Sequence, residues 1–359
     1  MRISFSAATI AVALATAVYP AQSYGILGHT LTGQVAQKLL TPETARQIKE
    51  ILSPYYDGLL SKAAPWPDTV KSKPEYRWAS VFHYVNTPGD NPPDECRFEY
   101  QFGGHDVLNG VYNMSSQLLH YKKNPPTTEV DRAQREDVLR FFVHFMGDIH
   151  QPLHTSGKDR GGNDAAARWG TAKSNLHKIW DSQMILKDIK ENFQDDPKAY
   201  LDCMMEKTNS LWLPDAANWT ICDPNSEEEQ RGGQQGKPNP WSDSIDGELA
   251  LHLCPKVWTR EMNGLVCEYA WKDYNGAEHD LSQAYYKRAT GAENGFLVQR
   301  LVAMGGVRMA AILNAIYDPS HYNQSLAEEE WTEKPKVLKK IVAATRMQRR
   351  QLRAAEIPS

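Results

Sequence analysis

The segment from His144 to His154 (HFMGDIHQPLH) constrains the fold of this chain more than any other. On a helix, His144 and Asp148 are four residues apart and lie on one face, among bulky apolar residues at positions 141 to 146. These neighbours place the pair in the core, where an aspartate needs a partner that a metal ion would supply. Pro152 then ends the helix and would turn His154 toward a second centre.

A second pair has the same spacing, because His177 and Asp181 flank Lys-Ile-Trp. One such pair is commonly an ordinary hydrogen-bonded pair, but two pairs with His154 between them predict a metal site. Nitrogen and oxygen ligands of this kind suit zinc best, with manganese or iron as alternatives. Upstream, Asp68 and His83 also stand among bulky residues; taken alone, they would suit a helix cap and a core histidine.

Helical periodicity dominates the chain and alternating strand patterns are scarce, which predicts a mainly α fold. One helix is expected to begin at Thr41, which offers a capping hydroxyl before a proline. Others are expected at 132–150, 174–185 and 281–316. The run 296–316 contains two arginines, which favours a buried amphipathic helix over a membrane span.

The first 23 residues are typical of a secretory signal peptide. Arg2 precedes an apolar run, 3–18, that is short for a membrane span, and Ala21 and Ser23 are small residues suited to cleavage before Tyr24. The alternative is a membrane anchor. We therefore expect a secreted chain without a stable anchor, which would pass through an oxidising, glycosylating pathway.

Five cysteines are then candidates for disulfides, and Cys222 and Cys254 would staple the base of a polar loop at 226–241. Three N-x-Ser/Thr sequons predict glycosylation at Asn113, Asn218 and Asn323.

We expect one helical domain at 24–320 and a charged tail at 321–359. The tail has an acidic run, 328–330, and then a basic stretch. It would be an arm that attracts RNA or a membrane, or a solvated helix or disordered tail; we favour the second reading because charge runs usually solvate a face. Since the net charge of the chain is −4, attraction for a polyanion must be local.

The order of the motifs resembles that of the zinc-dependent type I nucleases of fungi and plants. The shared motifs are G-x-x-G-H at 25–29, W-x-D at 66–68, H-[FY] at 83–84, H-x-x-x-D-x-H-Q-P-x-H at 144–154, G-G-N at 161–163 and H-x-x-x-D at 177–181. That family is mostly α-helical, resembles bacterial zinc phospholipase C in fold, and holds three zinc ions in one cleft.

The resemblance implies three ligand sets. They are Asp68, His83, His144 and Asp148 for one zinc; His154, His177 and Asp181 for a second; and His29, Asp148 as a bridge, and the amine and carbonyl of Tyr24 for a third. Cleavage after Ser23 would free that amine. The family usually has tryptophan at the first mature position, but backbone ligands tolerate tyrosine there. The resemblance also pairs Cys96 with Cys267 in a disulfide.

The implied activity is hydrolysis of single-stranded DNA and RNA to 5′-phosphorylated products by a metal-activated water, with 3′-nucleotidase action on nucleotides. Asp68, Asp148 and Lys71 are the catalytic candidates. Tyr84 would stack on an unpaired base and Asn163 would make a polar contact with the substrate. We expect a monomer.

Two other functions compete with this prediction. A phospholipase C would use the same scaffold, and a secreted binding protein would hold zinc structurally. Structural zinc sites are normally closed and often rich in cysteine, whereas this set is open and contains only histidine and aspartate, which favours catalysis.

Overall fold

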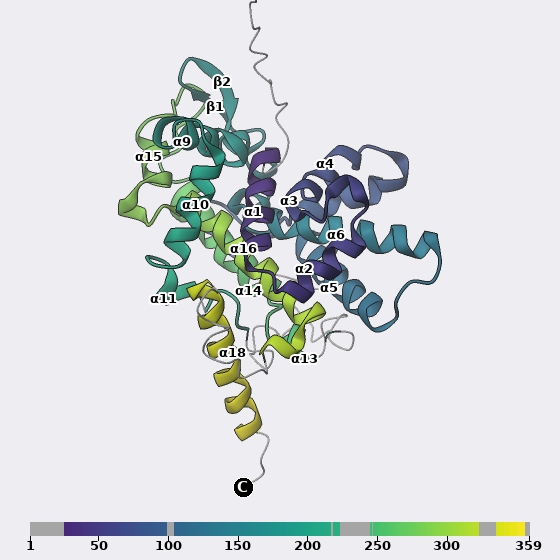
Figure 1. Cartoon of the computed structure of the whole chain (residues 1–359). Coiled ribbons are helices and arrows are strands. Elements are labelled where there is room, and N and C mark those ends of the chain that lie inside the picture. The colour runs from purple at the N-terminus through teal and green to yellow at the C-terminus, as the bar shows by residue number, and fades with distance from the viewer. Residues whose placement is uncertain are drawn as a thin grey trace, which may run out of the picture.

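The computed structural model describes residues 25–98, 104–216, 218–222, 245, 247–322 and 335–355. These residues are mainly helical, as predicted (Figure 1). Their one sheet is an antiparallel hairpin of β1 (Ala166–Trp169) and β2 (Ala172–Asn175), which turns at Gly170 with a φ of +62°.

The α-helices are α1 (Gly25–Leu39), α2 (Pro42–Ile51), α3 (Leu60–Ala63), α4 (Trp66–Val70), α5 (Val107–Lys123), α6 (Glu129–Asp148), α7 (Asp159–Gly162), α8 (Leu176–Lys178), α9 (Met184–Asn192), α10 (Pro197–Thr208), α11 (Leu213–Ala216), α13 (Gly247–Ala250), α14 (Pro255–Leu265), α15 (Ala284–Thr290), α16 (Leu297–Tyr317) and α18 (Lys336–Ala355). Short 3₁₀ helices are η1 (Pro54–Tyr56), η2 (Pro74–His83), η3 (Pro152–Thr155), η7 (Ala292–Asn294) and η8 (Pro319–Tyr322), and η4 (Ile179–Gln183) and η6 (Val266–Ala270) are π-helical turns.

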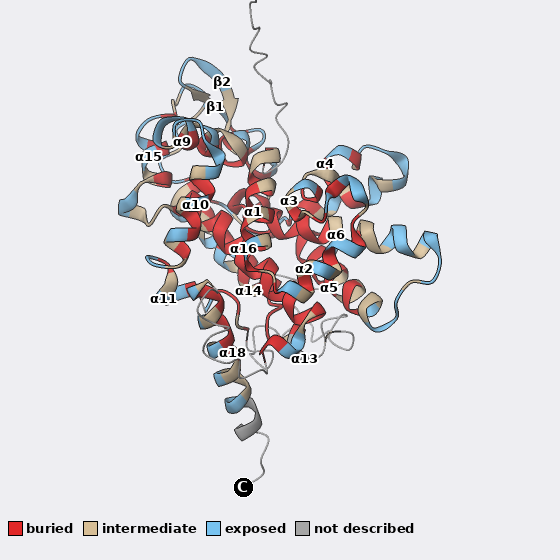
Figure 2. Ribbon diagram, in the orientation of Figure 1, coloured by how far each residue is buried: buried red, intermediate tan, exposed pale blue. Residues whose placement is uncertain are grey.

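Helix α16 forms the centre of the core (Figure 2). Every residue in it except Arg300 is buried, so the expected amphipathic helix is instead covered on nearly all sides. A Cβ at Gly306 would lie 2.5 Å from Val35 Cβ, and one at Gly305 would lie 3.3 Å from the His150 ring. These two glycines therefore let α1 and the end of α6 approach α16 closely.

Helix α6 carries the segment that the sequence singled out. It begins at Glu129, three residues before the expected start, because the Thr128 hydroxyl accepts a hydrogen bond from the Asp131 amide at 3.1 Å. All residues from 138 to 148 in this helix are buried, apart from the half-buried Arg140. The helix ends at Asp148, and the Gln151 side chain then caps η3 by accepting from the Leu153 amide at 2.6 Å.

Two other expected helices differ from the structure. Ser174 and Asn175 belong to β2, and Asn175 caps the following helical segment by accepting from the Lys178 amide at 2.7 Å. The run 281–316 is interrupted between α15 and α16, where Gly295 and Phe296 take positive φ values of 66° and 57°. Apolar spacing alone did not reveal this break. The cap that was expected at Thr41 is present, since its hydroxyl accepts from the Thr44 amide at 3.1 Å.

Both expected disulfides are formed, Cys96–Cys267 and Cys222–Cys254, and Cys203 is free. The expected loop at 226–241 and Asn323 lie outside the described residues. Of the other sequons, Asn218 is exposed, and Asn113 is half-buried.

The tail forms helix α18, which packs against α11 and η8. Val337, Leu338, Ile341 and Val342 are buried there, and Arg346 Nε donates to the Tyr322 carbonyl at 3.2 Å. The described part of the tail is thus a helix with its apolar face docked on the body and basic residues exposed on the other side, which agrees with the expected solvated helix and not with a disordered tail. Among the described residues, no helix has both the length and the apolarity that crossing a bilayer requires.

Candidate metal centre and cleft

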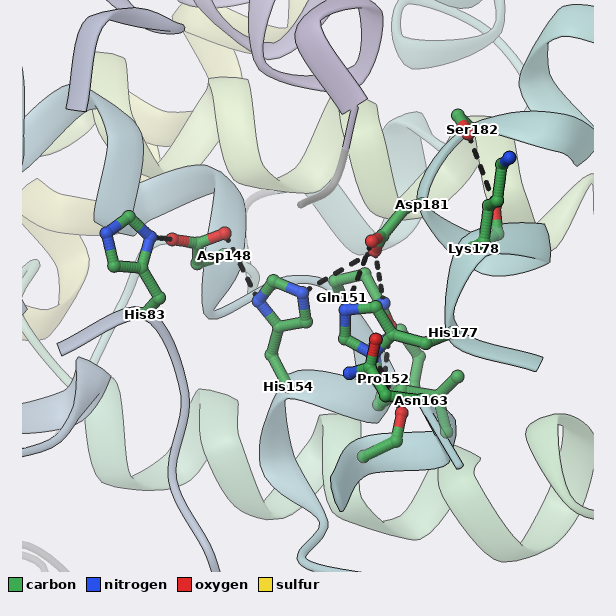
Figure 3. Close-up of polar contacts among 12 residues, drawn as sticks. His83, Asp148, Gln151, Pro152, His154, Asn163, His177, Lys178, Asp181 and Ser182 are labelled. Atoms are coloured by element: carbon green, nitrogen blue, oxygen red, sulfur yellow. Dashed lines mark hydrogen bonds and ion pairs between the residues drawn. The ribbon is translucent and has the colours of Figure 1, made fainter. Parts of the chain in front are cut away.

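The structure brings eight predicted ligand side chains into one buried cluster. They come from α1, α4, η2, α6, η3, α8 and η4, and they are His29, Asp68, His83, His144, Asp148, His154, His177 and Asp181. Figure 3 shows Asp148 between His83 and His154, and Asp181 beside His154 and His177. Residues that lie far apart in the sequence therefore meet at one place.

The first group consists of His83, His144, Asp68 and Asp148. The two ring nitrogens, His83 Nδ1 and His144 Nε2, lie 2.9 Å apart. Asp148 Oδ2 lies 2.9 Å and 3.1 Å from them, and Asp68 Oδ1 lies 3.9 Å and 3.7 Å from them. Ligand atoms bound tetrahedrally at about 2.1 Å from zinc are about 3.4 Å apart, so this spacing suits one zinc ion.

The second group consists of His154, His177 and Asp181. Asp181 Oδ2 lies 3.1 Å from His177 Nε2, and Asp181 Oδ1 lies 3.5 Å from His154 Nε2. The two imidazole rings stack with centroids 5.0 Å apart. Three protein ligands leave a fourth position of a tetrahedral ion open, as in catalytic zinc sites.

Asp148 links these groups to His29. Its Oδ1 lies 3.4 Å from His29 Nε2 and 3.1 Å from His154 Nδ1, while its Oδ2 faces the first group. Tyr24 lies outside the described residues, so its role as a ligand stays a prediction. The adjacent Gly25, with a φ of +50°, packs against Asp181: a Cβ there would lie 3.0 Å from the Asp181 carbonyl oxygen.

The electrostatics of the cluster require positive charge. Burial opposes ionisation of Asp148 and Asp181, yet the neighbouring histidines hold the pKa of both carboxyl groups below the usual range. Burial works against a charged His154 as well, but Asp148 and Asp181 raise its pKa to about 10. Burial lowers the pKa of His83 to about 4, so this imidazole is a neutral ligand. Two ionised carboxylates that are buried need positive charge nearby, and a bound metal cation would supply it.

Unsatisfied atoms support the same conclusion. Asp148 Oδ1 and both ring nitrogens of His154 are buried and have no hydrogen bond of good geometry, although they lie 3.1–3.5 Å from one another or from Asp181. Such atoms are costly in a protein interior unless another ligand satisfies them. Their positions, together with the donor set, fit metal ions.

Neighbouring groups orient the ligands. His144 Nδ1 donates to the Ala64 carbonyl at 2.8 Å and His177 Nδ1 donates to the Gly161 carbonyl at 2.7 Å, which leaves each Nε2 for a metal. Gln151 Nε2 donates to Asp181 Oδ1 at 2.7 Å. Gln151 was not among the predicted site residues, although its place between His150 and Pro152 in the H-Q-P motif was a signal.

The buried Arg308 on α16 contacts His150, which lies just after the end of α6. Arg308 Nη1 donates to His150 Nε2 at 3.0 Å, its Nε to the Trp219 carbonyl at 2.7 Å and its Nη2 to Glu261 Oε2 at 2.7 Å. His150 in turn donates from Nδ1 to the Met146 carbonyl at 2.7 Å. This network connects the end of α6 to α16, and nothing in the local sequence indicated it.

A cleft of about 610 Å³ opens over the cluster. Its walls include the predicted Lys71, Tyr84 and Asn163, together with His83, His154, His177 and Asp181. Lys71 Nζ donates to Asp68 Oδ1 at 2.8 Å, the side chain of Tyr84 is 42% exposed, and Asn163 is exposed. Arg160 and Lys178 also line the cleft; sequence reasoning missed both, although each adjoins a motif.

A helical fold with histidine and aspartate groups open to a cleft defines a metal-dependent hydrolase. The chain belongs to the S1/P1 nuclease family, whose model matches residues 24–318. It is 32% identical over 314 residues to Endonuclease 1 of Arabidopsis thaliana, covering 84% of this chain and 89% of the relative. It is 27% identical over 320 residues to Nuclease S1 of Aspergillus oryzae (88% and 97% covered) and 25% identical over 296 residues to Nuclease P1 of Penicillium citrinum (82% and 98% covered).

The protein is therefore a nuclease, a hydrolase that acts on nucleic acid. The predicted family, fold class and enzyme class are confirmed. The family implies zinc, and the histidine and aspartate groups of this chain are able to hold metal ions.

Proposed function

We propose that this nuclease is a secreted, monomeric endonuclease that cleaves single-stranded DNA and RNA to 5′-phosphorylated products and has 3′-nucleotidase activity. The active site would hold three zinc ions per chain. The observation that carries the proposal is the position of Asp148, whose two oxygens face different groups of ligands below a cleft lined by the exposed ring of Tyr84.

The proposal has three ligand sets, and the first and third share Asp148. Asp68, His83, His144 and Asp148 hold the first, and His154, His177 and Asp181 hold the second. His29, Asp148 and the backbone of Tyr24 hold the third. Bound zinc would lower the pKa of a water molecule and stabilise negative charge on a phosphate.

Lys71 contributes charge at the same place. Its ammonium group lies 2.8 Å from Asp68 Oδ1 at the wall of the cleft. Once a metal shares the Asp68 carboxylate, the ammonium group can bind a phosphate oxygen and hold the scissile group against the cluster. Asp68 thereby positions Lys71 as well as a metal.

Tyr84 accounts for the preference for single strands. A half-exposed aromatic ring beside the cluster offers a stacking surface to any base. Bases in a duplex are already stacked and paired, so only an unpaired base can use this surface. Asn163, which lines the same cleft, would contribute a polar contact.

Secretion rests on the sequence of residues 1–23. Two disulfides are compatible with an oxidising compartment. Exposed Asn218 is accessible to glycosylation. Sequencing the amino terminus of exported protein tests this part: Tyr24 should come first, and any other first residue would contradict the role of the Tyr24 amine in the third ligand set.

Substitution of Tyr84 by alanine tests the substrate preference. Loss of one stacked base costs about 1–3 kcal/mol, so kcat/KM on single strands should fall roughly 5- to 150-fold. Tyr55→Ala is the matched control, because Tyr55 is 81% exposed and does not line the cleft. Equal cleavage of duplex and single strand by the unaltered enzyme, or 3′-phosphate products from a 5′-labelled strand, would contradict the proposal.

Zinc content of the exported protein tests the number of ions. We expect three zinc ions per chain, and loss of both zinc and activity in Asp148→Asn, because that residue serves two ligand sets. Full zinc content in this variant would show that Asp148 does not bridge. Phosphatidylcholine hydrolysis is the negative control, and release of its headgroup would indicate the phospholipase alternative.

A further inference from the structure

Helix α18 carries a concentration of positive charge that the cleft does not use. The helix has seven basic and no acidic residues, whereas the whole chain has a net charge of −4, so the remainder of the chain carries −11 (−4 minus +7). Lys336, Lys340 and Arg350 are exposed, and they form no ion pair with any other described residue. Their charges are therefore available to an anionic partner.

We propose that the exposed basic face of α18 is a second binding surface, for the phosphate backbone of single-stranded nucleic acid. The inference rests on the proposed polynucleotide substrate. Lys336 and Arg350 are 14 positions apart, which is about 21 Å along a helix. A positive row of this length matches a charged polymer better than a single phosphate group.

The packing of α18 argues against a lipid surface. A helix that binds a membrane inserts an apolar face flanked by basic residues. Here the apolar residues Val337, Leu338, Ile341 and Val342 are buried against the protein body. Among the described residues of α18, the large hydrophobic side chain that is exposed is that of Met347. One such side chain is not enough to insert the helix into a bilayer. What remains is charge, which suits a soluble polyanion.

The surface is separate from the cleft. Figure 1 places α18 at the end of the molecule opposite α4 and the β1–β2 hairpin, and the cleft residues Lys71 and Asn175 belong to those elements or directly follow them. Mononucleotides and dinucleotides cannot contact both places. A long strand can, and its second contact raises the effective concentration of the strand at the cleft.

The test compares the exported, zinc-loaded enzyme, with its tail intact, with the triple variant Lys336→Gln/Lys340→Gln/Arg350→Gln. The probe is a long oligothymidylate with phosphorothioate linkages that resist cleavage, and its dissociation constant is measured by fluorescence anisotropy between about 50 and 200 mM salt. Lys49→Gln/Lys190→Gln/Lys272→Gln is the matched control, since it removes three exposed charges that lie outside α18. The charge-preserving Lys336→Arg/Lys340→Arg/Arg350→Lys variant controls for packing.

Removal of three phosphate contacts should reduce the slope of log K against log salt by about 2 units, since each contact contributes about 0.7. If the affinities converge near 1 M salt, the loss is about 100-fold near 0.1 M. The charge-preserving variant should bind as the unaltered enzyme does, and dinucleotide hydrolysis should be the same in all variants.

Two results would overturn the inference. One is a change in slope no larger than that of the lysine control. The other is unchanged oligonucleotide binding together with lost binding to phosphatidylserine vesicles, which would identify a lipid partner. Dinucleotide cleavage reports on the proposed function independently, so a failure of that function is distinguishable from a failure at α18.

Discussion

Gly147 offers a direct test of the metal centre, because alanine at this position would press on a ligand. A Cβ at Gly147 would lie 2.5 Å from His29 Nδ1 and 2.9 Å from His29 Cε1. The His29 ring cannot retreat, since its other face stacks on His144 with ring centroids 3.8 Å apart. Gly147→Ala should therefore displace His29 from Asp148 and weaken the set of ligands to which His29 belongs.

The size of the effect on stability follows from the distance between the added Cβ and His29. Ordinary contacts between carbon atoms begin near 3.4 Å, so the Cβ of alanine would be about 1 Å too close to the buried ring. Overpacking of this kind costs about 1–3 kcal/mol, and alanine returns up to about 1 kcal/mol through its helix propensity. The expected net result is a Tm lowered by a few degrees, with about one zinc ion lost per chain.

Elemental analysis, thermal unfolding and single-strand cleavage measure these effects together. Gly264→Ala is the control, because Gly264 lies in α14 and a Cβ there has no neighbour within 4 Å. That variant should keep its zinc and be as stable as the unaltered enzyme or slightly more so. Full zinc content and an unchanged Tm in Gly147→Ala would refute the placement of His29 as a ligand held between α6 and His144.

Three further predictions concern stability. Arg308→Met should cost about 2–6 kcal/mol and lower Tm by about 10 °C, because it leaves the buried His150 Nε2 and the buried Trp219 carbonyl without their donor, at about 1–3 kcal/mol each; a loss below about 1 kcal/mol would argue against this network. Burial lowers the pKa of His252 to about 4, below its unfolded value near 6.5, so its contribution is present above pH 6.5 and is lost as pH falls toward 4. His252→Gln should flatten the dependence of Tm on pH in that window, and an unchanged profile would contradict the shift. Replacing Cys222 and Cys254 by serine opens a disulfide spanning 32 positions and should cost about 4 kcal/mol in chemical denaturation, whereas a cost below about 1 kcal/mol would show that the bond adds little.

Local pattern accounts for most of what the sequence predicted correctly. His144 and Asp148 share a helix face because four residues make about one turn, and the apolar residues between them require that face to be buried. The hydroxyl of Thr41 caps α2 for an equally local reason. Where a break depends on backbone geometry, as at Gly295 and Phe296, apolar spacing missed it.

The sequence by itself therefore determined the helical class, the chemistry of the ligands and the family. Only the tertiary structure decided which ligand atoms face each other, that Gln151 orients Asp181, that Arg308 supports the end of α6, and that the apolar face of α18 is covered. The physical reason is distance along the chain. Periodicity and capping act between residues a few positions apart, whereas α1, α6 and α16 meet because bare glycine surfaces at 305 and 306 allow close packing between segments far apart in sequence.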